Sequence, residues 1–386
     1  MDINLIKEAY KKKEFMFLRT NKSKEFYSLM PWKEINRILR QGRLQHPRLR
    51  LHKEGEAFNE ESYVERKVLR RGGYDNKIIE QKFYELIENG ATVVIDAIDE
   101  LYEHLDLFVT EIERIFASKI QINAYMSWGN HRGFTTHWDD HDVLIFQVFG
   151  KKNWFVFNET RKHPLYRDLH EKHIPPQNPE WNNIIQAGDI LFIPRGQWHH
   201  AVAMNEPSLH LTFGFECRTG ISYIQWLQEK LTESEIFRKD LPCLATKKEI
   251  LRQHNIIKKK IQEALGVHTL ASYINELEVR MEHRPRFSLP WGISTAQKYS
   301  NCQLVFNVNM IADYKTNKAT GIVSFMAKNK SYEFSLSCAP FFKLLMDYKP
   351  HDFKECSSIL AEEVPEERFE EMVGYLVKDG LIAAIG

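Results

Sequence analysis

The middle of the chain, from residue 120 to residue 217, consists of short apolar runs separated by turn residues, and this pattern restricts the fold most strongly. Many short strands at close spacing predict a barrel or a jelly roll. Predicted helices lie before and after these strands instead of alternating with them, which argues against a doubly wound α/β sheet. The runs are IQINAYMSW (120–128), VLIFQV (143–148), WFVF (154–157), GDILFIP (188–194) and LHLTFGFE (209–216).

Helical periodicity occurs on both sides of this strand-rich region. Apolar residues at helical spacing predict helices over 77–89 and 101–116, and three more over 221–231, 246–265 and 270–283. Strands are expected again at 302–312, 320–328 and 331–337, followed by a helix that ends at Gly380. Near the N-terminus, Leu49 and Leu51 alternate with polar residues as in a short strand.

Charge and cysteine content exclude several classes of protein. The 53 Lys and Arg residues nearly balance 52 Asp and Glu residues, so the net charge of +1 argues against a dedicated nucleic-acid clamp. The chain has five cysteines, an odd number, and no CxxC motif. This cysteine usage fits a reducing cytosol better than a disulfide scaffold. No apolar run reaches the length of about 18 residues needed to span a membrane. A cytoplasmic protein is therefore expected.

The main chemical motif is the tripeptide His137-Trp138-Asp139. Residues i and i+2 of a strand point to the same side, so His137 and Asp139 can converge on one point. A second histidine, His199 or His200, follows the turn Pro194-Arg195-Gly196, 60 residues after Asp139 (199 − 139). Two imidazoles and one carboxylate form a facial triad for non-haem iron(II). Asp140, His141 and Asp142 are alternative ligands, although the strand register favours Asp139.

The runs HWDDHDVLIFQVFGKKNW (137–154) and GDILFIPRGQWHHA (188–201) resemble JmjC-type cupin oxygenases that use iron(II) and 2-oxoglutarate. They look most like the branch that contains the ribosomal oxygenases, and the resemblance covers about residues 80–217. It implies an α+β fold built on a double-stranded β-helix (cupin or jelly-roll) barrel. The implied domains are an N-terminal extension packing on the barrel (1–75), the JmjC catalytic domain (76–218), a helical dimerisation region (219–288) and a winged-helix-like C-terminal domain (289–386).

The same resemblance assigns roles to individual residues. The family's PxGxxH pattern selects His199 over His200, because the histidine is the third residue after the glycine. The metal ligands and catalytic residues are then His137, Asp139 and His199. The family's basic residue for the distal carboxylate of 2-oxoglutarate falls on Lys152, in place of the arginine of many relatives. Further cofactor-binding residues are expected at Asn123, Tyr125 and Thr212.

By this resemblance, iron(II), 2-oxoglutarate and O2 are the cofactors, and succinate and CO2 are released. The expected reaction is hydroxylation of an amino-acid side chain in a protein or peptide substrate, either a ribosomal protein or a ribosomally made precursor peptide. The alternatives are an N-methyl-lysine demethylase and a non-catalytic metal-binding cupin scaffold. A homodimer is expected, and no membrane partner.

Local charge patterns refine the expected partners. Six glutamates between 362 and 371 would repel phosphates and therefore argue against direct nucleic-acid binding by the C-terminal domain. The basic stretch 247–260 is interpreted as the solvated face of a dimer helix instead of an RNA contact. One group of arginines could line a groove for an acidic peptide or be surface charge: Arg43, Arg48, Arg50, Arg66, Arg70 and Arg71.

Overall fold

The computed structural model describes residues 2–41, 44, 47–70, 72–170, 174–281, 283–293 and 299–386. The chain divides into two compact units, Met1–Cys217 and Arg218–Gly386. Each unit has a hydrophobic core of its own. The two units are therefore described separately.

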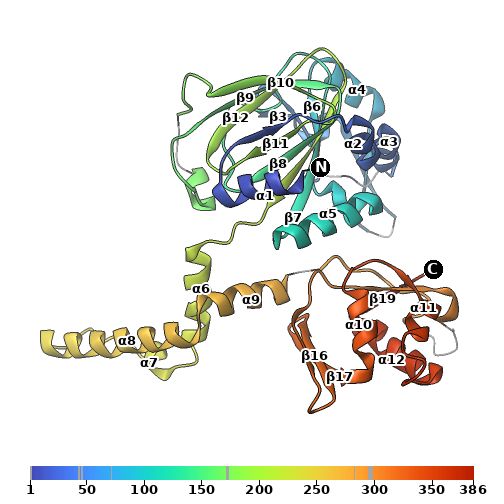
Figure 1. The fold of residues 1–386 in the computed structure, drawn as a ribbon. Helices are drawn as coiled ribbons and strands as arrows, with labels where there is room; N and C mark the ends of the chain where they lie inside the picture. Colours follow the sequence, from blue (N-terminus) through green and yellow to red (C-terminus); the bar gives the residue numbers. More distant parts are fainter. Residues whose placement is uncertain are drawn as a thin grey trace. The chain divides into compact units, whose positions relative to one another are not determined.

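Two antiparallel sheets form the barrel of the first unit (Figure 1). The larger sheet has the order β1-β11-β8-β13-β7-β6-β2-β3, and the smaller has the order β10-β9-β12. The larger sheet comprises β1 (Met16–Leu18), β2 (Leu49–Lys53), β3 (Glu56–Ala57), β6 (Thr92–Ile95), β7 (Ile120–Ser127), β8 (Val143–Phe149), β11 (Ile190–Ile193) and β13 (Ser208–Phe215). The smaller comprises β9 (Lys151–Glu159), β10 (Trp181–Gln186) and β12 (Gln197–Ala203).

All five predicted strands of the central region are present, and the predicted jelly-roll class is confirmed. The order of the strands also shows what local patterns could not: β8 lies between β11 and β13, two strands that are distant from it in the chain. The N-terminal segment supplies strands of the same sheet, because β1 pairs with β11 and β2 pairs with β6.

Helices pack on the outer face of the larger sheet. They are α1 (Ile3–Lys12), α2 (Ser23–Leu29), α3 (Trp32–Arg40), α4 (Glu80–Glu88) and α5 (Glu103–Phe116). Strand β7 shows why the two faces differ: Ile122, Ala124 and Met126 are fully buried in the helix-covered core, whereas Asn123 and Tyr125 lie on the opposite face of the strand. The alternation of one strand thus separates the stabilising core from the face that can carry a site.

The remaining elements of the first unit are short. They are the hairpin strands β4 (Val64–Val68) and β5 (Tyr74–Ile78) and the 3-10 turns Glu60–Ser62, Ile98–Leu101 and Tyr166–His170. None of the helices in the described ranges is both long and apolar enough to cross a membrane.

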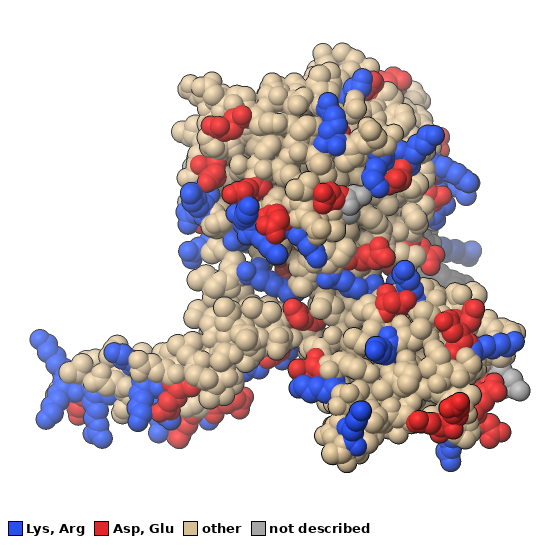
Figure 2. Space-filling model, in the orientation of Figure 1, with Lys and Arg blue, Asp and Glu red and all other residues tan. Residues whose placement is uncertain are grey.

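The second unit begins with helices and ends in a mixed domain. Its helices are α6 (Gly220–Leu231), α7 (Glu235–Arg238), α8 (Lys247–Val267), α9 (Leu270–Arg280), α10 (Ala339–Leu345), α11 (Phe353–Ser358) and α12 (Glu366–Asp379). Its strands are β14 (Gln303–Phe306), β15 (Ala312–Asn317), β16 (Ile322–Ala327), β17 (Lys330–Ser335), β18 (His351–Asp352) and β19 (Ile382–Ile385). Lysines and arginines follow the surface of α8 (Figure 2), none of whose residues is buried. The dimerisation and winged-helix assignments stay predictions.

One prediction for the second unit is wrong in detail. The strand expected over 302–312 is divided, because β14 ends at Phe306 and β15 begins at Ala312. Between them, the side-chain amide of Asn307 exchanges hydrogen bonds with the backbone of Arg286, at 3.1 and 3.3 Å. These bonds fix the chain in a non-strand path at this point.

Truncating a core aromatic should destabilise the first unit. Phe213 is fully buried and lies 4.8 Å from Phe146 between ring centroids. Phe213→Ala should lower the free energy of unfolding by about 3–5 kcal/mol, because it leaves a cavity in a packed core. The matched control is Phe287→Ala, since Phe287 is 84% exposed. Hydrogen exchange with mass spectrometry should show faster exchange in residues 1–217 for the first variant only; unchanged protection there would contradict the prediction.

Candidate metal centre and cofactor pocket

A short backbone pairing between the two sheets creates the candidate metal centre. His137 lies in the connection from β7 to β8, and His199 lies on β12. The two form an isolated antiparallel bridge, in which His137 N–H donates to His199 O (3.1 Å) and His199 N–H donates to His137 O (2.7 Å). This bridge gives the connection strand-like geometry at His137, so that Asp139 projects to the same side. The ligand atoms of His137, Asp139 and His199 all lie within 4.8 Å of one another.

Backbone carbonyls orient both imidazoles in the same way. Nδ1 of His137 lies 2.8 Å from the carbonyl oxygen of Thr135, and Nδ1 of His199 lies 3.0 Å from that of Gln197. A carbonyl can only accept, so each Nδ1 carries the proton and each Nε2 keeps its lone pair for a metal. In both cases the acceptor is two residues earlier in the chain, so the local strand geometry itself fixes the tautomer.

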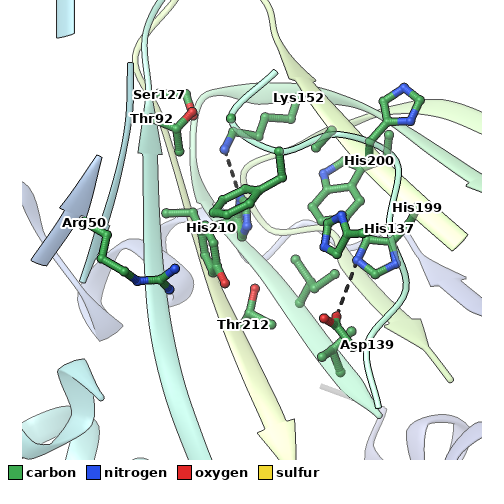
Figure 3. Close-up of a pocket in the computed structure, with 17 residues that line it drawn as sticks. Arg50, Thr92, Ser127, His137, Asp139, Lys152, His199, His200, His210 and Thr212 are labelled. Atoms are coloured by element: carbon green, nitrogen blue, oxygen red, sulfur yellow. Dashed lines mark hydrogen bonds and ion pairs between the residues drawn. The ribbon is translucent and has the colours of Figure 1, made fainter. Parts of the chain in front are cut away.

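The charges at this cluster also suit a metal cation. Nε2 of His199 is 3.5 Å from Oδ2 of Asp139 (Figure 3). Burial and the neighbouring His137 lower the pKa of His199 to about 4, so its imidazole is neutral at pH 7. Burial would raise the pKa of Asp139, but His199 and His137 lower it overall, so the carboxylate stays ionised. Two imidazoles and one carboxylate are the donor set of a non-haem iron(II) site with open positions.

The structure places His200 away from the three ligands. Its ring stacks on Phe155, with centroids 4.6 Å apart, and its Nδ1 contacts the Thr136 hydroxyl at 3.0 Å. Successive residues of β12 face opposite sides, so only one of the two adjacent histidines can join the cluster.

The other alternative ligands have partners of their own. His141 contacts Asp140 at 3.0 Å, and Asp142 forms a 2.6 Å ion pair with Lys13, the residue that follows α1. In the described part of the chain, none of these three residues belongs to the cluster of potential metal ligands. The carboxylate that the i, i+2 relation favoured is thus the one that lies with the two histidines, and its role as a ligand stays a prediction.

The cluster opens into a cavity of about 260 Å³ between the two sheets. Lys152, on β9, is 3% exposed and its Nζ contacts Nδ1 of His210 at 3.2 Å. Burial lowers the pKa of Lys152 to about 7. Within the described residues, no carboxylate lies within ion-pair distance of this amine. A buried amine that lacks an anionic partner, beside a metal site, is a feature expected of an anion-binding pocket.

The remaining predicted cofactor residues divide into two groups. Tyr125 and Thr212 line the cavity. Asn123 lies on the same face of β7, but its Oδ1 accepts hydrogen bonds from Ala97 N–H (3.1 Å) and from the Gln121 side chain (3.0 Å). Asn123 is not among the residues that line the cavity. The cofactor-binding roles of all three residues stay predictions.

Sequence reasoning did not identify His210 as part of the site. His210 is buried, stacks on Tyr125 with centroids 4.8 Å apart, and contacts Lys152. Burial and the charge of Lys152 lower its pKa well below the usual value, so it is a neutral acceptor for the amine. The signal that could have found it is its position two residues before Thr212, on the same face of β13.

The arginine-rich N-terminal segment gives a mixed result. Arg50 lines the cavity, whereas Arg48 pairs with Glu100 at the surface and Arg66 lies 3.8 Å from the centroid of the Tyr74 ring. Arg43 and Arg71 lie outside the described residues. One arginine of this group therefore belongs to the site, which its spacing in the sequence did not show.

Comparison with known proteins identifies relatives of part of the chain. Residues 100–223 match the JmjC domain family. A Drosophila melanogaster protein named bifunctional lysine-specific demethylase and histidyl-hydroxylase NO66 is 29% identical over 107 residues, which are 27% of this chain and 16% of that protein. The protein of the same name from Brugia malayi is 26% identical over 163 residues, 39% of this chain and 22% of the relative. The chain spans less than a third of the length of these relatives.

Solved structures resemble the whole chain. The match to the X-ray structure of E. coli ycfD covers 100% of this chain and 98% of the ycfD chain, with a TM-score of 0.62 and 14% sequence identity. A second structure is described as YcfD, a ribosomal oxygenase from E. coli, in complex with cobalt and 2-oxoglutarate. Its match covers 100% of this chain and 99% of the YcfD chain, with a TM-score of 0.58 and 13% sequence identity. At such identity the likeness establishes the fold. The resemblance to JmjC-type cupins drawn from the motifs is confirmed.

Metal binding should distinguish the adjacent histidines. His199→Ala removes a predicted ligand and should weaken Co(II) or Mn(II) binding by more than about 100-fold, since even the outer partners of metal ligands contribute about 10–100-fold. His200→Ala is the matched control and should bind almost as the unmodified chain does. Titration calorimetry on the full chain measures both. A loss confined to His200→Ala would place the third ligand one residue later.

Proposed function

We propose, on the premise that residues 100–223 form a JmjC domain, that this chain is an iron(II)- and 2-oxoglutarate-dependent oxygenase that hydroxylates a side chain of a protein or peptide. The observation that carries the proposal is the buried Lys152, which shares one cavity with His137, Asp139 and His199. A scaffold protein would gain nothing from a buried amine without an anionic partner, because burial of such a group costs free energy.

The three clustered side chains would hold the metal. With 2-oxoglutarate, iron(II) uses O2 to insert one oxygen atom into a substrate C–H bond and releases succinate and CO2. The chain's own task is to present two Nε2 lone pairs and one carboxylate oxygen on one side of the metal. The Thr135 and Gln197 carbonyls keep the imidazoles in this orientation.

Lys152 would bind the distal carboxylate of 2-oxoglutarate. Its ammonium form is disfavoured by burial in the free protein, and an incoming carboxylate would favour that form again. His210 accepts a hydrogen bond from the amine and thereby directs it into the cavity, whose wall also includes Tyr125 and Thr212. Both hydroxyl groups are suitable donors to a carboxylate.

The relatives support a polypeptide substrate. The Drosophila and Brugia proteins are named as a lysine demethylase and histidyl-hydroxylase, and the E. coli protein is described as a ribosomal oxygenase. We favour a ribosomal protein or a ribosomally made precursor peptide as the substrate, in the cytoplasm. We also retain a homodimer formed through residues 219–288, where α8 exposes apolar residues such as Ile250 and Leu251.

The reaction itself can be tested on the full chain. Anaerobically purified protein supplied with iron(II), 2-oxoglutarate and O2 should form succinate, and cell proteins or peptides should gain 16 Da in a gene-dependent manner. Asp139→Ala should reduce succinate formation at least about 100-fold, because it removes a metal ligand. Asp140→Ala is the matched control, since Asp140 lies outside the cluster. Equal turnover by the two variants would refute the proposed iron site.

Lys152→Met should stabilise the ligand-free protein and abolish its stabilisation by 2-oxoglutarate. The folded pKa of about 7 lies below the ordinary 10.5, so between these values the unfolded chain binds more protons. The buried lysine therefore lowers the free energy of unfolding by an amount on the order of a few kcal/mol. This destabilisation is complete below pH 7 and decreases as the pH rises toward 10.5.

The control for this prediction is Lys151→Met, since Lys151 is the exposed neighbour on the same strand. Thermal unfolding at pH 6.5 and pH 10, with Mn(II) and with or without 2-oxoglutarate, measures the effect. The Lys152→Met advantage should shrink at pH 10. Continued stabilisation of this variant by 2-oxoglutarate would show that another residue binds the cofactor.

A further inference from the structure

Arg50 reaches the cavity from the N-terminal segment. In the backbone register, Arg50 on β2 pairs with Val94 on β6, Val94 pairs with Tyr125 on β7, and Tyr125 pairs with His210 on β13. These four residues form one row across the sheet, and Arg50, Tyr125 and His210 all line the cavity. Figure 3 shows Arg50 extending toward the cavity from the side opposite His137 and Asp139. From this position, Arg50 can contact a substrate that enters the cavity toward the metal.

The guanidinium of Arg50 is held in a fixed orientation. Nε and one terminal nitrogen donate to the two carboxylate oxygens of Asp96, at 2.7 and 2.8 Å. The other terminal nitrogen contacts Nε2 of His52 at 3.3 Å. An arginine carries five N–H groups, so two remain without an acceptor within the described chain. Both are on the terminal nitrogens, and a fixed fork of this kind binds acceptors at little cost in side-chain entropy.

Asp96 sets the charge of this group. Burial would lower the pKa of Arg50, but the hydrogen bonds and the charge of Asp96 raise it, so the guanidinium stays charged. The carboxylate of Asp96 is not among the groups that line the cavity. The cavity therefore faces N–H donors, while the compensating negative charge lies behind them.

We infer that Arg50 is a specificity-determining residue, which donates hydrogen bonds to the target side chain and selects side chains that end in an acceptor. The chemical class is a carboxamide, carboxylate or imidazole, in contrast to the cationic ends of lysine, N-methyl-lysine and arginine. This inference rests on the proposed function and names the substrate class of the same site.

The other charged groups of the cavity disfavour a cationic target. Among its lining residues, Lys152 would be occupied by the cofactor carboxylate, Asp139 is the single carboxylate and would hold the metal, and Arg50 is left as a charged donor. Tyr125 and Phe134, with centroids 6.0 Å apart, offer aromatic surface, but a buried cation also needs an anion or acceptors. Among the described lining residues, none supplies a free carboxylate for an ammonium or guanidinium group. A neutral or anionic acceptor finds donors in the same place.

The test uses small probes and the full chain loaded with Mn(II) and N-oxalylglycine. Acetamide and guanidinium are similar in size, and proton relaxation by Mn(II) measures how strongly each enters the cavity. We expect acetamide to be relaxed more strongly than guanidinium. In Arg50→Met the affinity for acetamide should fall about tenfold, as expected for hydrogen bonds to a charged group. Arg50→Lys, which keeps a cation beside Asp96 but loses the planar fork, should show a similar loss.

The matched control is Arg48→Met. Arg48 also pairs with a carboxylate, Glu100, at 2.5 Å, but it does not line the cavity. This variant should bind acetamide as the unmodified chain does. Stronger relaxation of guanidinium, or acetamide binding that is independent of Arg50, would overturn the inference.

The second readout is the identity of the residue that gains 16 Da in cell proteins. Asn, Asp, Gln, Glu or His would support the inference, and Lys or Arg would overturn it. These outcomes are distinct from failure of the proposed function, which would appear as an absence of succinate formation by the chain loaded with iron(II). The probe experiment needs no turnover and still reports on Arg50 in that case.

Discussion

The site depends on one backbone contact, the antiparallel bridge between His137 and His199. The connection that carries His137 and Asp139 is also held by a bridge between Arg132 and Val202 and by a hydrogen bond from Gly196 N–H to the Asp139 carbonyl. The His137–His199 bridge ties it to β12 of the smaller sheet, and the same two residues that exchange backbone hydrogen bonds provide the imidazoles. Backbone geometry thus sets the separation of the ligands, so their placement does not rely on flexible side chains. Such preorganisation keeps the cost of binding a metal low.

The cavity inside the barrel is lined by two basic side chains, of which only one has a carboxylate partner. Arg50 is paired with Asp96, whereas Lys152 is buried with a neutral histidine as its contact. The Lys152 arrangement opposes folding stability, because a buried amine without an anionic partner is costly. The large helix-covered aromatic core on the other face of the sheet can compensate for this cost. One face of the sheet packs in the core and the other lines the cavity because successive residues of a strand point to opposite faces.

Much of the fold and part of the site could be predicted from local patterns. The five central strands, the flanking helices and the pairing of His137 with Asp139 all depend on periodicities of two or 3.6 residues, which are visible in a window of a few residues. The choice between His199 and His200 required the family pattern, since alternation shows only that one of them must face away. The division of the strand expected at 302–312 was not predictable, because it depends on Asn307 reaching Arg286, 21 residues away in the chain.

By itself, the sequence determined the class of the fold and indicated that His137 and Asp139 converge, since both follow from short-range spacing. The choice of His199 as third ligand and of Lys152 for the cofactor came from the family pattern, and these roles stay predictions. Only the tertiary structure decided which groups complete the cavity. His210 reaches Lys152 across 58 residues of chain. Arg50 enters through a row of four strands from a segment that resembled surface charge. Long-range strand order brings these residues together, and no local periodicity encodes that order.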